Sequence, residues 1–128
     1  KDMTLITKAN LSSFLEYYHS LHDSYITNIN YNITNSQIEL LIDIYWSGKL
    51  QLNEDGTYKT NKVKLKMNLN GVEQCNIKEM FSWNYINEVY IQYVKVKNQE
   101  FICFASDKEE PLVYILCDNI EYEELKED

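Results

Sequence analysis

Between Asn10 and Asp23 the apolar residues recur every three or four positions, which is the spacing of a helix with one buried stripe. This apolar set comprises Leu11, Phe14, Leu15, Tyr18 and Leu21. Side chains spaced in this way lie on the same face of an α-helix and can pack together against a core. We therefore predict a helix over residues 11–22, with Asn10 available to cap its first turn.

From residue 25 the apolar period changes to two, the period of a β-strand with one buried face. The first such segment spans residues 25–33, and its apolar face holds Tyr25, Ile29, Tyr31 and Ile33. The second spans residues 38–46, and its apolar face holds Ile38, Leu40, Ile42, Ile44 and Trp46. In the third, residues 63–69, apolar residues alternate with lysines. We predict a strand over each segment.

Further strands are predicted over residues 89–97, 100–106 and 112–118, and residues 120–125 add a possible seventh. Two other segments have weaker patterns. Asn70 and Gly71 predict a tight turn, after which Val72 starts a hairpin partner for residues 63–69. Residues 77–82 combine helical spacing with aromatic residues typical of strands, and we expect a short helix or turn there.

These elements predict a single domain over residues 1–128 of the α+β class. A chain of 128 residues can bury one two-layer core, and no linker or repeat divides it. Short turns between consecutive strands favour antiparallel pairing. The expected architecture is an N-terminal helix packed on a mainly antiparallel sheet of six to seven strands, as a curled sheet or partial barrel.

The charge of the chain is concentrated near its end. The sequence has 12 lysines, no arginine and 20 acidic residues, which gives a formal charge of -8. Residues 1–99 are neutral overall, and the excess acids form two clusters: Asp107, Glu109 and Glu110, and then Glu121, Glu123, Glu124, Glu127 and Asp128. Such a field attracts basic proteins and repels phosphates. We therefore expect a basic protein partner and no nucleic acid.

The sequence lacks the signature motifs of several classes of enzyme. No G-x-S-x-G element is present, and the three glycines are too far apart to form a phosphate-binding loop. We expect a protein that is not an enzyme and needs no cofactor. Cys75, Cys103 and Cys117 are odd in number and form no C-x-x-C pair, which favours a reducing cytoplasm. The longest apolar run has six residues, and we expect no membrane partner.

The sharpest local motif is His19, His22 and Asp23. On one helix, residues three apart share a face, so these side chains are a weak candidate for a divalent metal site and a metal-dependent hydrolase. The favoured interpretation is structural. In it, His22 lies near the negative end of the helix and Asp23 turns the chain into the first strand.

Aromatic residues complete the candidate binding surfaces. The candidates are Tyr45, Tyr58, Tyr90, Tyr93, Tyr114 and Tyr122, with Trp46 and Trp83, and strand alternation places several of them opposite the expected core face. Tyrosine and tryptophan often anchor protein interfaces. The leading prediction is a protein-binding surface formed by Asp107, Glu109, Glu110, Tyr114, Glu121, Tyr122, Glu123 and Glu124. An alternative is a small-ligand cavity lined by Trp46, Trp83 and Phe104.

A row of lysines, Lys59, Lys62, Lys64 and Lys66, follows one face of the third strand. It can receive an acidic partner or the acidic end of the chain itself. The favoured interpretation is a solvated outer face that discourages pairing with other chains.

A family resemblance rests on two short runs. Leu21-His22-Asp23-Ser24-Tyr25-Ile26 follows the predicted helix, and Leu40-Leu41-Ile42-Asp43-Ile44 lies in the second strand. Over residues 14–46 the chain resembles small bacterial proteins whose L-H-D-x-x-I element follows an N-terminal helix, similar to the immunity proteins that accompany secreted polymorphic toxins. The resemblance implies a small cytoplasmic protein that neutralises a cognate toxin by binding it, and it transfers no site residue.

Overall fold

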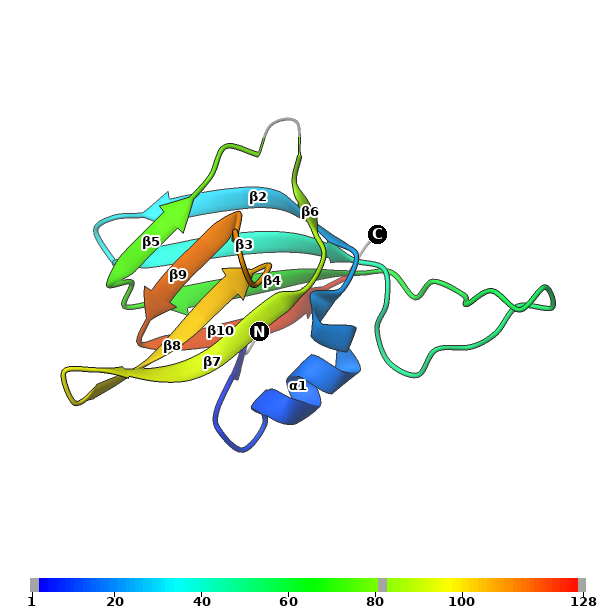
Figure 1. Cartoon of the computed structure of the whole chain (residues 1–128), viewed down its shortest axis with the longest axis horizontal. Helices are drawn as coiled ribbons and strands as arrows, with labels where there is room; N and C mark the ends of the chain where they lie inside the picture. Colours follow the sequence, from blue (N-terminus) through cyan, green and yellow to red (C-terminus); the bar gives the residue numbers. More distant parts are fainter. Residues whose placement is uncertain (1–2, 81–82, 127–128) are drawn as a thin grey trace.

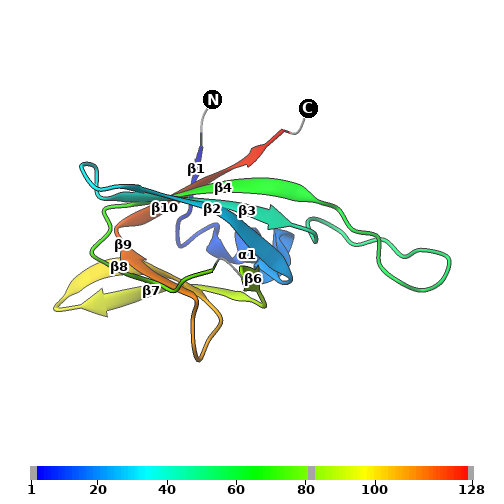
Figure 2. The ribbon, with the colours of Figure 1, turned by 90° about the horizontal axis from the view of Figure 1, so that it is seen from above.

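Two antiparallel sheets stack face to face, because most strands carry one apolar face that must be buried. The computed structural model describes residues 3–80 and 83–126, and Figures 1 and 2 show the two sheets as separate layers. The larger sheet has the strand order β1-β10-β4-β3-β2-β6, and the smaller has the order β5-β9-β8-β7. All of the pairs between these strands are antiparallel.

The larger sheet is formed by β1 (Thr4–Leu5), β10 (Asn119–Leu125), β4 (Val63–Asn70), β3 (Gln37–Ile44), β2 (Ser24–Asn32) and β6 (Tyr85–Ile86). The smaller sheet is formed by β5 (Gln74–Ile77), β9 (Val113–Cys117), β8 (Gln99–Ser106) and β7 (Val89–Val96). All seven predicted strands are present, and the mainly antiparallel α+β class is confirmed. The expected curled sheet or partial barrel is wrong, since the strands divide into two separate sheets. Strands β1 and β6 are missing from the prediction because two residues are too few to display a period. Strand β5 begins two residues after Val72, where the sequence predicts the start of a strand.

The hydrophobic core lies between the sheets. Strand β3 shows the predicted alternation most clearly, with its even-numbered residues buried and its odd-numbered residues half-exposed. The larger sheet contributes Ile26, Ile38, Leu40, Ile42, Ile44, Leu65, Met67, Leu69 and Ile120, and the smaller contributes Val89, Ile91, Ile102, Phe104, Val113, Ile115 and Cys117. Trp46 lies beyond the end of β3 and is only partly buried. The observed strand therefore ends at Ile44, two residues before the predicted end at Trp46.

After β4 the chain crosses to the other sheet instead of forming a hairpin. Gly71 adopts a positive φ of 66°, and β5 then pairs with β9 rather than with β4. The prediction that Val72 starts a hairpin partner of β4 is therefore wrong. The helix or turn expected over residues 77–82 is also not found as a helix: Ile77 ends β5, the next three residues have no regular structure, and residues 81–82 lie outside the described part.

The predicted N-terminal helix is shorter than expected. Helix α1 spans Leu11–Tyr17, and Figure 1 shows it at one side of the sandwich, below β7 and β10. After Tyr18, three residues form a tight turn, η1 (His19–Leu21), whose φ angles are all positive. Asn10 makes no side-chain cap, because its amide oxygen accepts from the Thr7 N–H instead. Within residues 3–80 and 83–126, no helix is long and apolar enough to cross a membrane.

A bulge in β2 changes which residues face the core. Its register against β3 shifts between Ile26 and Asn28. Before the shift Ser24 and Ile26 are buried and Tyr25 is exposed, whereas Ile29 packs against the core after it. The predicted single face of Tyr25, Ile29, Tyr31 and Ile33 is wrong because an extra residue reverses the alternation. As a result, Tyr25 lies on the outer surface of the sheet.

Residues 47–62, between β3 and β4, form an arm that projects from the two sheets (Figures 1 and 2). Its base is closed by Ser47 and Asn61: the Ser47 hydroxyl donates to the Asn61 carbonyl at 2.9 Å, and the Asn61 amide donates to the Ser47 carbonyl at 3.0 Å. Leu52 and Tyr58 form an isolated bridge within the arm, and both are exposed.

Two neighbouring leucines in β3 test the assignment of its even-numbered residues to the core face. Leu40 is completely buried, and its replacement by alanine leaves a cavity, so Leu40→Ala should lower the free energy of unfolding by about 2–5 kcal/mol. Leu41 lies on the outer face, and Leu41→Ala should cost less than about 1 kcal/mol. Urea denaturation measures both. Equal losses would contradict the assignment.

Candidate functional site

Two neighbouring cavities share Tyr85, on the short strand β6. Ile86 is fully buried, so the side chain of the preceding residue, Tyr85, points outward from the same strand. We call the first cavity the acidic cleft; it has a volume of about 690 Å³ and is lined by Trp83, Tyr85, Asn87, Glu88, Tyr90, Asp107, Lys108, Glu109 and Glu110. We call the second the tyrosine pocket; it has a volume of about 560 Å³ and is lined by Asp23, Tyr25, Thr27, Asp43, Tyr45, Trp46, Thr60, Asn84 and Tyr85.

The acidic cleft is held together by backbone contact between two loops. The N–H of Asp107, just after β8, donates to the carbonyl of Glu88, just before β7, at 2.8 Å. This bond joins the start of the loop after β8 to the turn between β6 and β7. Four carboxylates line the cleft against one lysine. The cleft therefore presents a local negative field.

Aromatic side chains form the other part of the cleft lining. Trp83 is 65% exposed, and its ring centroid lies 5.9 Å from that of Tyr85 in an edge-to-face arrangement. Tyr90 adds a third ring from β7. An exposed tryptophan fixed against a second ring offers a large apolar contact area at little cost in side-chain entropy.

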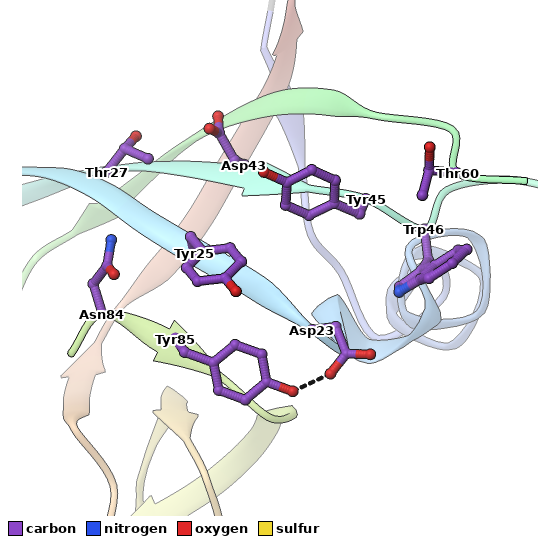
Figure 3. A pocket seen from close by; sticks show the side chains of 9 residues that line it. All are labelled: Asp23, Tyr25, Thr27, Asp43, Tyr45, Trp46, Thr60, Asn84 and Tyr85. Carbon is purple, nitrogen blue, oxygen red and sulfur yellow. Dashed lines mark hydrogen bonds between the residues drawn. The ribbon is translucent and has the colours of Figure 1, made fainter.

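The tyrosine pocket contains three tyrosine rings, of which Tyr25 makes edge-to-face contact with each of the other two (Figure 3). The Tyr25 centroid lies 5.9 Å from that of Tyr45 and 5.5 Å from that of Tyr85. The Tyr85 hydroxyl donates a hydrogen bond to Oδ1 of Asp23, and this bond is the main reason that the pKa of Tyr85 rises to about 12. Tyr85 is therefore a protonated donor at neutral pH, and it orients the Asp23 carboxylate.

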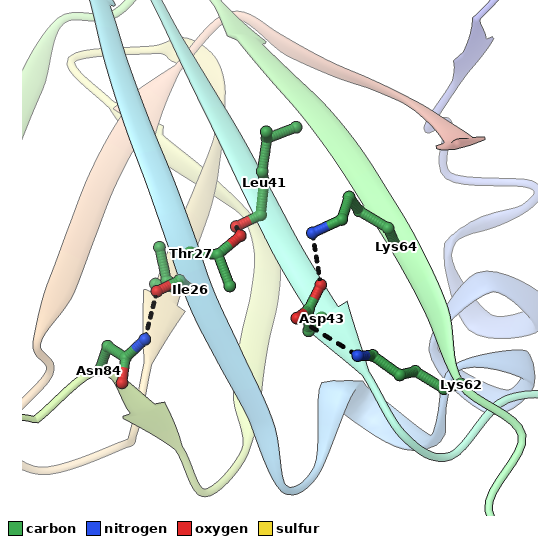
Figure 4. A network of polar contacts seen from close by, with 7 residues as sticks. All are labelled: Ile26, Thr27, Leu41, Asp43, Lys62, Lys64 and Asn84. Carbon is green, nitrogen blue, oxygen red and sulfur yellow. Dashed lines mark hydrogen bonds and ion pairs between the residues drawn. The ribbon is translucent and has the colours of Figure 1, made fainter. Parts of the chain in front are cut away.

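Asp43, at the other end of the pocket, is paired with the chain's own lysines (Figure 4). Lys64 Nζ lies 2.7 Å from Asp43 Oδ1, and Lys62 Nζ lies 3.8 Å from Asp43 Oδ2. Lys66 pairs in the same way with Glu39, at 3.4 Å. Lys64 and Lys66 lie on the outer face of β4, where the sequence places them, and pair with carboxylates of β3. Lys59 and Lys62 belong to the arm before β4 and do not continue this row along the strand.

The predicted protein-binding residues do not form one surface. Asp107, Glu109 and Glu110 come together in the acidic cleft. Tyr114 lies in β9, where it is paired with Ala105 of the neighbouring strand β8, and does not line that cleft. Of the second acidic cluster, Glu121, Glu123 and Glu124 lie in β10, whose alternation sends its residues to opposite faces of the larger sheet.

On the inner face, Tyr122 and Glu124 support helix α1. The Tyr122 ring packs against Phe14 at a centroid distance of 4.6 Å, and Glu124 accepts a hydrogen bond from the Tyr18 hydroxyl at 2.7 Å. On the outer face, Glu121 accepts from the Asn70 amide at 2.8 Å, and Glu123 lies opposite Lys66. Glu127 and Asp128 lie outside the described residues.

His19, His22 and Asp23 line one small cavity, but the left-handed turn η1 replaces the predicted helix there, so the two imidazoles do not share a helix face. His19 Nε2 contacts the Gly48 carbonyl at 2.7 Å, and His22 Nδ1 contacts the Asn87 carbonyl at 2.6 Å. His22 Nε2 lies 3.4 Å from Asp23 Oδ2. In the described part of the chain, no group of three or more His, Cys, Asp or Glu side chains is arranged to hold a metal ion.

The residues expected to line a ligand cavity are also separated. Phe104 is fully buried in the core, Trp46 lines the tyrosine pocket, and Trp83 lines the acidic cleft. Sequence reasoning missed Tyr25, Tyr85 and Glu88 as site residues. A strand of two residues carries no period that could have revealed Tyr85, and the β2 bulge reversed the face assigned to Tyr25.

No protein-family model, curated protein or solved structure matches the chain. The functional argument therefore depends on the site itself.

The Tyr18 and Glu124 pair gives a prediction about stability. Burial and the bond to Glu124 raise the pKa of Tyr18 well above its ordinary value of 10. The folded state thus retains a proton that the unfolded state loses above about pH 10, so stability falls as the pH rises through that range. Tyr18→Phe should lose about 1–2 kcal/mol at neutral pH, and its free energy of unfolding should fall less than that of the wild type between about pH 9 and about pH 11.

Urea denaturation at each pH measures this effect. Tyr17→Phe is the matched control, because the Tyr17 side chain is exposed. A decline of equal size in wild type and Tyr18→Phe would contradict the assignment.

Proposed function

We propose that the protein is a non-enzymatic binding domain whose acidic cleft captures a basic protein. The observation that carries the proposal is the placement of four carboxylates around three aromatic side chains, including a largely exposed tryptophan. Carboxylates accelerate encounter with a basic partner, and aromatic side chains supply short-range binding energy through buried area and contact with cationic groups.

The lysines of the chain compete little for this site. Those of β4 pair with Asp43 and Glu39 on the outer face of the larger sheet. Within the cleft, Lys108 is the one lysine among the lining residues, against Glu88, Asp107, Glu109 and Glu110. These carboxylates therefore remain available to a partner.

A cognate toxin is the partner that the immunity-protein resemblance suggests. Many toxic nucleases are basic, and capture by an acidic inhibitor is then fast and selective. The projecting arm supports such a role, since Leu52 and Tyr58 expose apolar area away from the two sheets. In this proposal the protein acts in the cytoplasm by occupying its partner.

Charge reversal in the cleft tests the proposal. Immobilised protein is incubated with lysate of the source cell, and the captured proteins are identified by mass spectrometry. We expect one basic protein at a stoichiometry near one to one. With that protein purified, the double variant Glu109→Lys/Glu110→Lys should lower the association rate constant by about tenfold or more at low salt and approach the wild type at high salt.

The matched control carries the same change in net charge at exposed positions outside the cleft, Glu16→Lys/Glu73→Lys. It should retain most of the association rate. Equal loss in both variants would show that net charge alone matters and would remove the cleft from the proposal. Capture of acidic proteins only would contradict a basic partner.

Trp83 tests the short-range part of the same interface. Trp83→Ser should weaken binding by about 2 kcal/mol, or about thirtyfold in Kd, mainly through faster dissociation. Tyr31→Ser is the control, because Tyr31 is also an exposed aromatic residue and lies outside both cavities. Surface plasmon resonance separates the two rate constants. Unchanged dissociation for Trp83→Ser would exclude it as an anchor.

A further inference from the structure

The tyrosine pocket lies beside the acidic cleft but differs from it in chemistry. Its centre is aromatic, and its two carboxylates lie at opposite ends (Figure 3). Tyr25 contributes a ring from β2, Tyr45 from the segment after β3, and Tyr85 from β6. Because Tyr85 lines both cavities, a partner bound in the cleft can also reach the pocket.

The two carboxylates of the pocket have different partners. Asp43 is 16% exposed and pairs with Lys62 and Lys64. Asp23 is 37% exposed, and the His22 imidazole lies beside it, with Nε2 at 3.4 Å from Asp23 Oδ2. No lysine of the described chain pairs with Asp23. Tyr85 orients its carboxylate through Oδ1, so Asp23 is the carboxylate that an incoming cation can meet.

One ring of this pocket, that of Tyr45, already contacts a cation of the chain itself. Lys62 Nζ lies 5.4 Å from the centroid of the Tyr45 ring, within the range of a cation–π interaction. The 128 residues contain no arginine, so none of their side chains can supply a guanidinium group to this pocket. Guanidinium is planar, stacks on aromatic faces and can donate two hydrogen bonds to one carboxylate.

We propose that the tyrosine pocket binds the guanidinium group of one arginine of the protein partner, with the Tyr25 ring contacting one of its faces and Asp23 accepting its hydrogen bonds. This inference rests on the proposed function, because it names the side chain through which a basic partner is recognised. The acidic cleft supplies attraction to basic proteins in general. The tyrosine pocket adds selection for arginine.

The probe is N-acetyl-L-arginine methylamide, titrated into the full chain labelled with ¹⁵N and followed by amide and indole NMR shifts. The matched probe is the citrulline analogue, which has nearly the same shape without the charge. We expect shifts centred on Asp23, Tyr25 and Tyr85, with a Kd of about 1–10 mM for the arginine probe. The citrulline analogue should bind at least about tenfold more weakly.

Variants separate the contribution of the Asp23 carboxylate to probe binding from that of the tyrosine rings. Asp23→Asn should weaken binding of the arginine probe by about tenfold. Asparagine tolerates the positive φ of 58° at this position. Tyr25→Phe keeps the ring and should change Kd by less than about twofold, whereas Tyr25→Leu should weaken binding by about fivefold or more. Tyr31→Leu, an exposed tyrosine of the same strand outside the pocket, should leave Kd unchanged.

Equal binding of both probes, shifts centred on the acidic cleft, or no localised shift would overturn the inference. If partner capture is lost on Glu109→Lys/Glu110→Lys but unchanged on Asp23→Asn, the proposed function stands and the arginine pocket fails. If the arginine probe binds the tyrosine pocket but Glu109→Lys/Glu110→Lys leaves partner capture unchanged, arginine binding by the pocket is supported and the proposed function of the acidic cleft fails.

Discussion

The structure depends on the burial of two apolar sheet faces against each other. Strand β3 lies inside the larger sheet, paired on both sides, and its inward residues are completely or almost completely buried. The apolar face of the larger sheet must be removed from water for so short a chain to be stable, and the smaller sheet covers that face. The repeated crossing of the chain between the sheets follows from this constraint.

The candidate site is a product of those crossings. Strand β6 pairs with only the first two residues of β2, yet this contact brings Tyr85 beside Tyr25 and Asp23. The turn before β7 then meets the loop after β8 through the bond between Asp107 and Glu88. Residues from five separate parts of the sequence thus line two adjoining cavities. None of these parts contains the site by itself.

The fold also divides the acidic residues according to their neighbours. In β10, alternation directs Glu124 toward Tyr18 and Glu121 toward Asn70, where each accepts a structural hydrogen bond. The carboxylates of Asp107, Glu109 and Glu110 instead lie together at a cleft beside exposed aromatic residues. Two clusters that are similar in sequence therefore have different surroundings, and partner binding is proposed for only one of them.

The sequence by itself determined the seven longer strands, their antiparallel pairing and the inner face of β3, because hydrophobic period is a local property that burial enforces. It also placed the lysines of β4 on the outer face. Only the tertiary structure decided the division into two sheets, the short strand β6, the β2 bulge and the left-handed turn at His19. Each of these depends on contacts between residues far apart in the chain, and such contacts leave no period in the sequence.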